Sequence, residues 1–165
     1  MWHNQTKNSF LLILITAVLF NCSGGKQSKL EKIRVQLVSE GPLYNGPNTA
    51  IGIWKPTIES GKKVKSVRFT SVKVSAADTS LSKIAGNLVL QLAASRAEMK
   101  KIAFFKGNAA TNEVELQLAD EQKDLNQFFE GQDITFVIDY DLLPEEWSQN
   151  LTFQLEFDAE LVTEE

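Results

Sequence analysis

Acidic side chains gather in the C-terminal third of the chain, where their spacing could support metal binding. Asp139 and Asp141 flank Tyr140, and Glu145 and Glu146 follow within six residues. Ca²⁺ prefers several oxygen ligands, so a loop with these carboxylates could hold that ion. The spacing does not match an EF-hand loop. We therefore interpret the run as a solvated acidic loop, with calcium binding as the less favoured alternative.

A second acidic set, Asp120, Glu121 and Asp124, precedes the segment LNQFFEG. Two carboxylates at a suitable separation are what a glycoside hydrolase needs. The chain has 21 acidic residues, however, and so offers many such pairs by chance. Negative charge also stabilises the start of a helix, which explains this set without catalysis. A carboxylate-dependent hydrolase is therefore the least favoured function.

The chain lacks the residues that other common kinds of catalysis need. The chain has one histidine, His3, and one cysteine, Cys22. Beyond Cys22, neither a serine–histidine–aspartate triad nor a histidine-based zinc site can be built. The glycines before Lys26 lack the spacing of a phosphate-binding loop. A net charge of −4 argues against sequence-independent binding to nucleic acid. We expect no enzyme activity, no cofactor, no metal and no nucleic-acid partner.

Cys22 ends an apolar segment near the N-terminus, and a single cysteine excludes an internal disulfide. Lys7 precedes an eleven-residue apolar run, residues 10–20, that is broken only by Thr16. A membrane-spanning helix needs roughly 20 apolar residues, whereas the apolar part of a signal peptide needs about 7 to 15. The segment before Cys22 therefore predicts a cleaved secretory signal.

The residues Leu19, Phe20, Asn21 and Cys22 resemble the lipobox of a bacterial lipoprotein signal, which reads Leu, small, small, Cys. Leu19 and Cys22 match this pattern, whereas Phe20 and Asn21 are larger than it specifies. The resemblance implies cleavage before Cys22 and a diacylglycerol group on its thiol. One acyl chain gives marginal membrane binding, whereas two or more anchor firmly. The alternatives are ordinary secretion with Cys22 as a free thiol, and an uncleaved anchor.

A polar stretch with two glycines follows Cys22 and is typical of a flexible tether. The predicted organisation is a signal peptide at residues 1–21, a tether at 22–30 and one domain at 31–165. Cleavage would remove Lys7 and no acidic residue, which leaves a net charge of −5. Ser23, in place of aspartate, resembles lipoproteins that are passed on to an outer membrane. The predicted location is the bacterial cell envelope at the outer membrane, on its periplasmic or its surface face.

From about residue 30 onward apolar and polar residues alternate, which predicts strands with one buried face. Clear alternation occurs in KIRVQLV, NLVLQLA, EVELQLA, DITFVIDY and LTFQLEFDAEL. Three further strands are predicted at TAIGIW, VKSVRFTSVKV and KIAFFK. In the second of these the alternation slips near Thr70 and Ser71, which predicts a bulge. Pro56 follows TAIGIW and predicts that this strand lies at a sheet edge.

About eight strands separated by turn signals predict an all-β fold. We expect an antiparallel β-sandwich, immunoglobulin-like or related, with about seven to eight strands and one or two short helices. An eight-stranded β-barrel is the alternative. Candidate helices are SRAEMK, LPEEWS and DEQKDLNQFFEG. In the last, Leu125, Phe128 and Phe129 share one face and Gly131 ends the helix, so it is expected to plug one end of the fold.

Three aromatic residues, Tyr44, Trp54 and Trp147, lie in or beside predicted loops and are candidate contacts for a ligand or partner. Such residues can stack on sugar rings or anchor a protein. We favour a core position for Trp147. For Trp54 both environments stay open, because Ile51 and Ile53 point to the opposite face of its strand.

Together these features predict a lipid-anchored envelope lipoprotein without catalytic activity. It would contact the membrane through the lipid on Cys22, and its β domain would bind another envelope protein or act in envelope assembly. A surface glycan-binding module that uses Trp54 and Tyr44 is the alternative.

Overall fold

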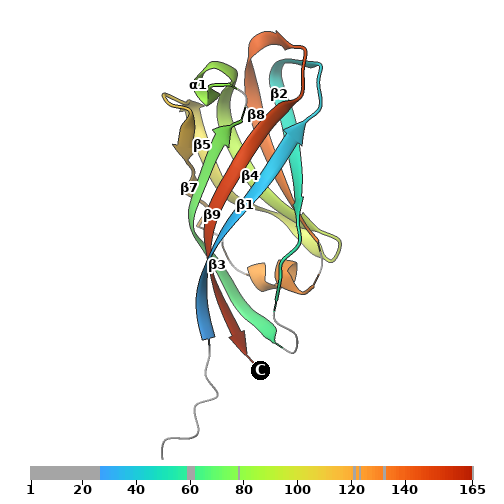
Figure 1. The fold of residues 1–165 in the computed structure, drawn as a ribbon, viewed down its shortest axis with the longest axis vertical. Helices are drawn as coiled ribbons and strands as arrows, with labels where there is room; N and C mark the ends of the chain where they lie inside the picture. The colour runs from blue at the N-terminus through green and yellow to red at the C-terminus, as the bar shows by residue number, and fades with distance from the viewer. Residues whose placement is uncertain are drawn as a thin grey trace, which may run out of the picture.

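β-strands dominate the protein in a computed structural model that describes residues 27–58, 62–77, 79–120, 122, 124–131 and 133–164 (Figure 1). This confirms the prediction of an all-β protein with few helices. The strands are β1 (Gln27–Ser39), β2 (Leu43–Trp54), β3 (Lys63–Ala76), β4 (Ala85–Ala94), β5 (Ala97–Asn108), β6 (Glu113–Glu115), β7 (Gln117–Leu118), β8 (Ile134–Trp147) and β9 (Leu151–Glu164). The helical segments are α1 (Leu81–Ile84) and the 3-10 helix η1 (Leu125–Phe129).

The strands of the described residues form one antiparallel sheet, in the order β6-β3-β9-β1-β2-β8-β4-β5-β7. β6 and β7 are separated only by Leu116, yet they lie at opposite ends of this order. The Leu116 amide donates to the Val72 carbonyl of β3 at 2.8 Å, and the Ala119 amide donates to the Ile102 carbonyl of β5 at 2.9 Å. This short segment bridges the two edges, so the sheet is nearly closed into a barrel.

A single sheet replaces the two facing sheets of the predicted β-sandwich, and the arrangement is closer to the alternative of a barrel. Alternation does not separate these folds, because each buries one face of every strand. The segment EVELQLA, predicted as one strand, is divided between β6 and β7. Its division decides the topology, since each half bonds to a different edge of the sheet.

The sheet bends sharply between β1 and β2, which pair at only one position, Val38 with Ile51. β2 has β8 as its second neighbour, so the edge position predicted from Pro56 is wrong. Pro56 lies beyond the end of β2, where its missing amide costs no ladder bond. At Gly52 a Cβ atom would lie 2.3 Å from the carbonyl oxygen of Gln36. The close crossing of the two strands therefore requires glycine.

Aromatic side chains pack the interior of the sheet. Phe157 on β9 contacts Phe69 and Phe136, with ring centroids 5.0 and 5.1 Å apart. Tyr140 on β8 packs edge-to-face with Phe153 at 4.9 Å. Each such pair contributes about 0.5–1.5 kcal/mol beyond the burial of its area. This core fixes the strands whose outward side chains form the surface.

η1 lies across the lower end of the sheet in Figure 1 and buries Leu125, Phe128 and Phe129, as the sequence predicts. It is a five-residue 3-10 helix rather than the longer helix expected. Gly131 follows with a φ of 72°, the left-handed conformation that glycine favours after a helix. This end of the sheet is therefore closed by three buried side chains of a short helix and not by a long helix.

The helices predicted at SRAEMK and LPEEWS are not formed. Ser95 and Arg96 make the tight turn between β4 and β5, and the residues after them enter β5. β8 continues through Pro144 to Trp147. In both segments, pairing with a neighbouring strand overrides a weak local preference for helix.

Two strand details bear on the predictions. The bulge predicted near Thr70 is confirmed, because the register of β3 against β9 shifts between Phe69 and Ser71. β1 begins at Gln27 and its first residues pair with the end of β9. The strand therefore starts inside the segment 22–30 that the sequence assigns to a tether.

Candidate functional site

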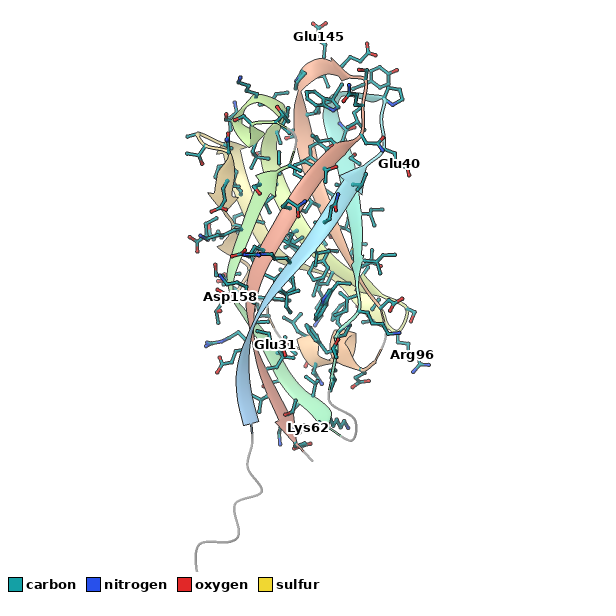
Figure 2. The ribbon with its side chains drawn as sticks, viewed as in Figure 1. Glu31, Glu40, Lys62, Arg96, Glu145 and Asp158 are labelled. Carbon is teal, nitrogen blue, oxygen red and sulfur yellow. The ribbon has the colours of Figure 1, made fainter. Side chains whose placement is uncertain are left out.

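Cys22 and the predicted signal peptide lie outside the described residues, so lipidation stays a prediction. The strand nearest to Cys22 in the chain, β1, begins at the lower end of the molecule in Figure 1, where β9 also ends. Figure 2 shows Lys62 at this end and Glu145 at the opposite one. In the part of the chain described here, we find no helix both long and apolar enough to cross a membrane.

The three candidate aromatic residues occupy different environments. Trp54 is half-buried and packs edge-to-face against Phe129 and Phe157, with ring centroids 5.9 and 6.3 Å away. Trp147 is half-buried against the core, and its indole nitrogen has no hydrogen-bond acceptor among the described residues. Tyr44 is 61% exposed and lies opposite Glu146 on β8, whereas Trp147 lies opposite Leu43. Tyr44 and Trp147 thus share one end of the sheet but point to opposite faces of it, and Trp54 lies at the other end of β2.

The acidic run lies mainly on the outer face of β8 and not in a loop. Asp139 accepts hydrogen bonds from Thr49 Oγ1 at 2.8 Å and from Gln91 Nε2 at 2.6 Å. Asp141 accepts one from Asn87 Nδ2 at 2.7 Å. Among the residues described, no group of three or more His, Cys, Asp or Glu side chains could hold a metal ion. The two aspartates link β8 to β2 and β4.

Inside the sheet, Ser39 and Tyr140 are buried polar residues. Ser39 Oγ donates to the Thr49 carbonyl at 2.8 Å and ties β1 to β2. The hydroxyl of Tyr140 makes no hydrogen bond of normal geometry within the described residues. Burial raises the pKa of Tyr140, and the nearby Ser39 hydroxyl offsets part of this rise. The phenol is therefore held in its neutral form.

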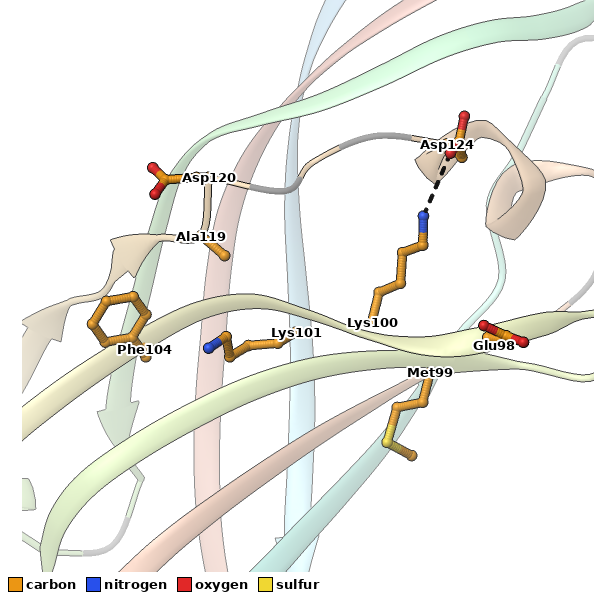
Figure 3. A pocket seen from close by; sticks show the side chains of 8 residues that line it. All are labelled: Glu98, Met99, Lys100, Lys101, Phe104, Ala119, Asp120 and Asp124. Atoms are coloured by element: carbon orange, nitrogen blue, oxygen red, sulfur yellow. Dashed lines mark ion pairs between the residues drawn. The ribbon is translucent and has the colours of Figure 1, made fainter.

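A groove of about 810 Å³ lies between β5 and the segment that follows β7 (Figure 3). Lys100 extends from β5 to Asp124 across this groove at 3.9 Å, and Met99 leaves the strand in the opposite direction. The ammonium of Lys101 lies 5.5 Å from the ring centroid of Phe104. Charges of both signs line the groove, so its lining favours no one class of charged ligand.

One outer surface of the sheet, formed by β1, β9 and β3, is held by ion pairs. Glu156 on β9 pairs with Arg34 at 2.7 Å and with Lys32 at 3.0 Å, both on β1. The hydrogen bond from Arg34, followed by that from Lys32, lowers the pKa of Glu156, and the bond to Glu156 raises the pKa of Lys32. Arg68 and Lys65 on β3 pair with Glu160 and Glu164 on β9. We call this surface the ion-paired face.

The other outer surface, across β2, β8, β4 and β5, carries apolar side chains among polar ones. The register sets Ile51 opposite Val137, Val137 opposite Gln91, and Gln91 opposite Lys101. The next row begins with Ile53, opposite Thr135 on β8. We call this surface the apolar face, and its apolar members are Ile51, Ile53, Val89, Ala93, Met99 and Val137.

Most of the exposed large hydrophobic side chains of the described residues lie on the apolar face. Ile51, Ile53 and Met99 are 51%, 68% and 54% exposed. The remaining large hydrophobic residue with comparable exposure in the described chain is Tyr44, which lies at the end of the sheet. Asp139, an acidic residue between Ile51 and Val89, accepts one hydrogen bond at each of its two oxygens. This carboxylate therefore keeps a donor at each oxygen when a partner covers the face.

Comparison with known proteins gives no relative from which a function could be carried over. No protein-family model matches the chain, and no curated protein matches its sequence.

The sequence did not identify the apolar face. In the segment TAIGIW both faces are apolar, since Ala50, Gly52 and Trp54 alternate with Ile51 and Ile53. The structure turns the isoleucines outward and the small residues with Trp54 inward. Alternation shows that the two sets face opposite ways, but with no polar residue as a marker it does not show which set is buried.

Proposed function

We propose that this protein is a bacterial envelope lipoprotein, anchored through lipid on Cys22, whose domain binds another envelope protein through the apolar face. The observation that carries the binding role is that Ile51, Ile53 and Met99 are exposed on one outer surface, with the apolar Val137 and Ala93 on the strands between them. Single exposed apolar residues are ordinary, whereas a contiguous set marks an interaction site. The anchoring role rests on the relaxed lipobox and the short apolar run before it.

The energetics favour this face over the ion-paired face. Complete burial of an Ile or Met side chain contributes about 1.5–3 kcal/mol. Because half to two-thirds of Ile51, Ile53 and Met99 is exposed, covering each would contribute roughly 1–2 kcal/mol. A surface ion pair contributes only about 0–1 kcal/mol, and a partner on that side would have to desolvate several. A partner therefore gains most on the apolar face.

The acidic residues support binding rather than catalysis. Asp139 and Asp141 accept hydrogen bonds from neighbouring strands, as structural carboxylates do. A hydrolase that uses carboxylates alone needs a free pair facing a substrate. A glycan module would depend on exposed aromatic rings, and Trp54 is packed against Phe129 and Phe157.

Affinity capture from solubilised envelopes tests the binding role. The test variant is Ile51→Ser with Ile53→Ser, and the matched control is Tyr44→Ser, which removes an equally exposed apolar side chain away from the face. We expect the double variant to bind the captured protein about 100-fold more weakly, because roughly 2–3 kcal/mol of burial is lost. The control should bind normally. Loss of binding with Tyr44→Ser alone would contradict the proposal and favour a site at the end of the sheet.

A further inference from the structure

The short link to Cys22 limits where the apolar face can stand above a membrane. Four residues, 23–26, separate Cys22 from Gln27, where β1 begins. Five residue steps of extended chain reach at most ~18 Å. An anchor on Cys22, as in the proposed function on which this inference rests, therefore keeps the lower end of Figure 1 close to the membrane.

The apolar face stands well away from that end. Ile51 on β2 is paired with Val38 of β1, eleven residues along the strand from Gln27. At about 3.3 Å per residue this is ~36 Å of strand, so with β1 standing up from the membrane Ile51 lies beyond the lipid headgroups. The face therefore points sideways into the aqueous layer, parallel to the membrane surface.

Two copies on one membrane would present this face at the same height. A twofold axis along the membrane normal then sets the two faces against each other, with β2 of one copy opposite β5 of the other. This places Ile53 of each copy near Met99 of the other. Ile53 lies opposite Thr135, and Thr135 lies opposite Ala93. Met99 is one of the two β5 residues between Ala97 and Lys100, which face Ala93 where the register shifts. The two most exposed side chains of the face would thus cover each other.

The charges of the face are compatible with such pairing. Asp139 keeps its bonds from Thr49 and Gln91, so each of its two carboxylate oxygens retains a hydrogen-bond donor when the face is covered. Lys101 would lie in the row of Ile51 of the other copy, and its long side chain lets the ammonium, near Phe104, reach water at the edge of the interface. Anchoring on one surface also raises the effective concentration of the second copy. We infer that the partner of the apolar face is the same face of a second copy of this chain.

Cysteine cross-linking in intact envelopes tests this inference on the full chain. The variant Ile53→Cys with Met99→Cys places two thiols three strands apart, at ~14 Å, which excludes a disulfide within one chain. Mild oxidation should give a band of twice the monomer mass that disappears on reduction. Ile53→Cys alone should give at least tenfold less of it, because the two Ile53 positions of a pair lie at opposite borders. Adding Ile51→Asp to the double variant should abolish the band.

Two controls define the background. The natural chain reports any reaction of Cys22. The variant Gln36→Cys with Ser75→Cys places thiols two strands apart on the ion-paired face and should stay monomeric. A cross-linked product of another mass would overturn the second copy as partner while leaving the binding role of the face intact. No cross-link at all would also overturn the inference, and normal capture by Ile51→Ser with Ile53→Ser would overturn the binding role itself.

Discussion

Replacing Trp54 and Ile53 by the same residue tests which side of β2 is buried. Trp54 contacts Phe129 and Phe157 edge-to-face, whereas Ile53 is 68% exposed. Loss of a buried tryptophan costs about 3–5 kcal/mol, and each aromatic pair about 0.5–1.5 kcal/mol beyond area. Because Trp54 is half-buried, we expect Trp54→Thr to lower the free energy of unfolding by about 2–3 kcal/mol.

Ile53→Thr should change the free energy of unfolding by no more than about 0.5 kcal/mol, since threonine keeps the branched shape that strands favour and no cavity forms. Urea unfolding of the Cys22→Ala chain, followed by circular dichroism, measures both variants. Equal slopes against urea would show that both unfold in the same way. If Ile53→Thr costs as much as Trp54→Thr, the assignment of the outward face is refuted, and with it the apolar face.

Three further predictions concern single residues. Gly52→Ala should destabilise the protein by about 1–3 kcal/mol or more in the same urea assay, because the new Cβ would lie 2.3 Å from the Gln36 carbonyl oxygen. Tyr140→Phe should change stability at neutral pH by less than about 1 kcal/mol, because its hydroxyl makes no hydrogen bond of normal geometry among the described residues. The raised pKa of Tyr140 stabilises the folded state below pH 10.0, and this stabilisation is lost as the pH rises through the folded pKa. The Tyr140→Phe protein should therefore unfold less readily than the natural chain in an alkaline titration. The lowered pKa of Glu156 stabilises the folded state above pH 4.5, the ordinary pKa of this group, and this stabilisation is lost as the pH falls through the folded pKa. The Glu156→Gln variant should therefore lose less stability than the natural chain as the pH is lowered. An acid limb as steep as that of the natural chain would contradict this role of Glu156.

Strong alternation made most of the strands predictable. In β1 and β9 the buried residues recur at every second position over long stretches, so type and facing follow directly from the sequence. The bulge at Thr70 was also readable, because a one-residue slip in facing has to be absorbed somewhere along β3. Leu125, Phe128 and Phe129 share one face at α-helical spacing, and all three are buried in the shorter η1.

The features of the fold that could not be predicted from the sequence depend on tertiary contacts. Nothing local marks Leu116 as the point where one segment leaves β3 and joins β5, yet this step nearly closes the sheet. Pro144 fits the first turn of a helix, but pairing within the sheet extends β8 through it. Ile51 and Ile53 face outward because β1 crosses close to Gly52 on the other side of β2. The sequence of β2 alone does not show that β1 comes this close.

The most direct test of the account is intact mass with membrane fractionation, comparing the natural chain with Cys22→Ala. The account predicts that the natural protein begins at Cys22, carries the added mass of acyl chains and sediments with membranes. The Cys22→Ala protein should carry no acyl mass and leave the membrane fraction. A natural protein without acyl mass in the soluble fraction would contradict the lipid anchor, and with it the argument that sets two apolar faces at one height.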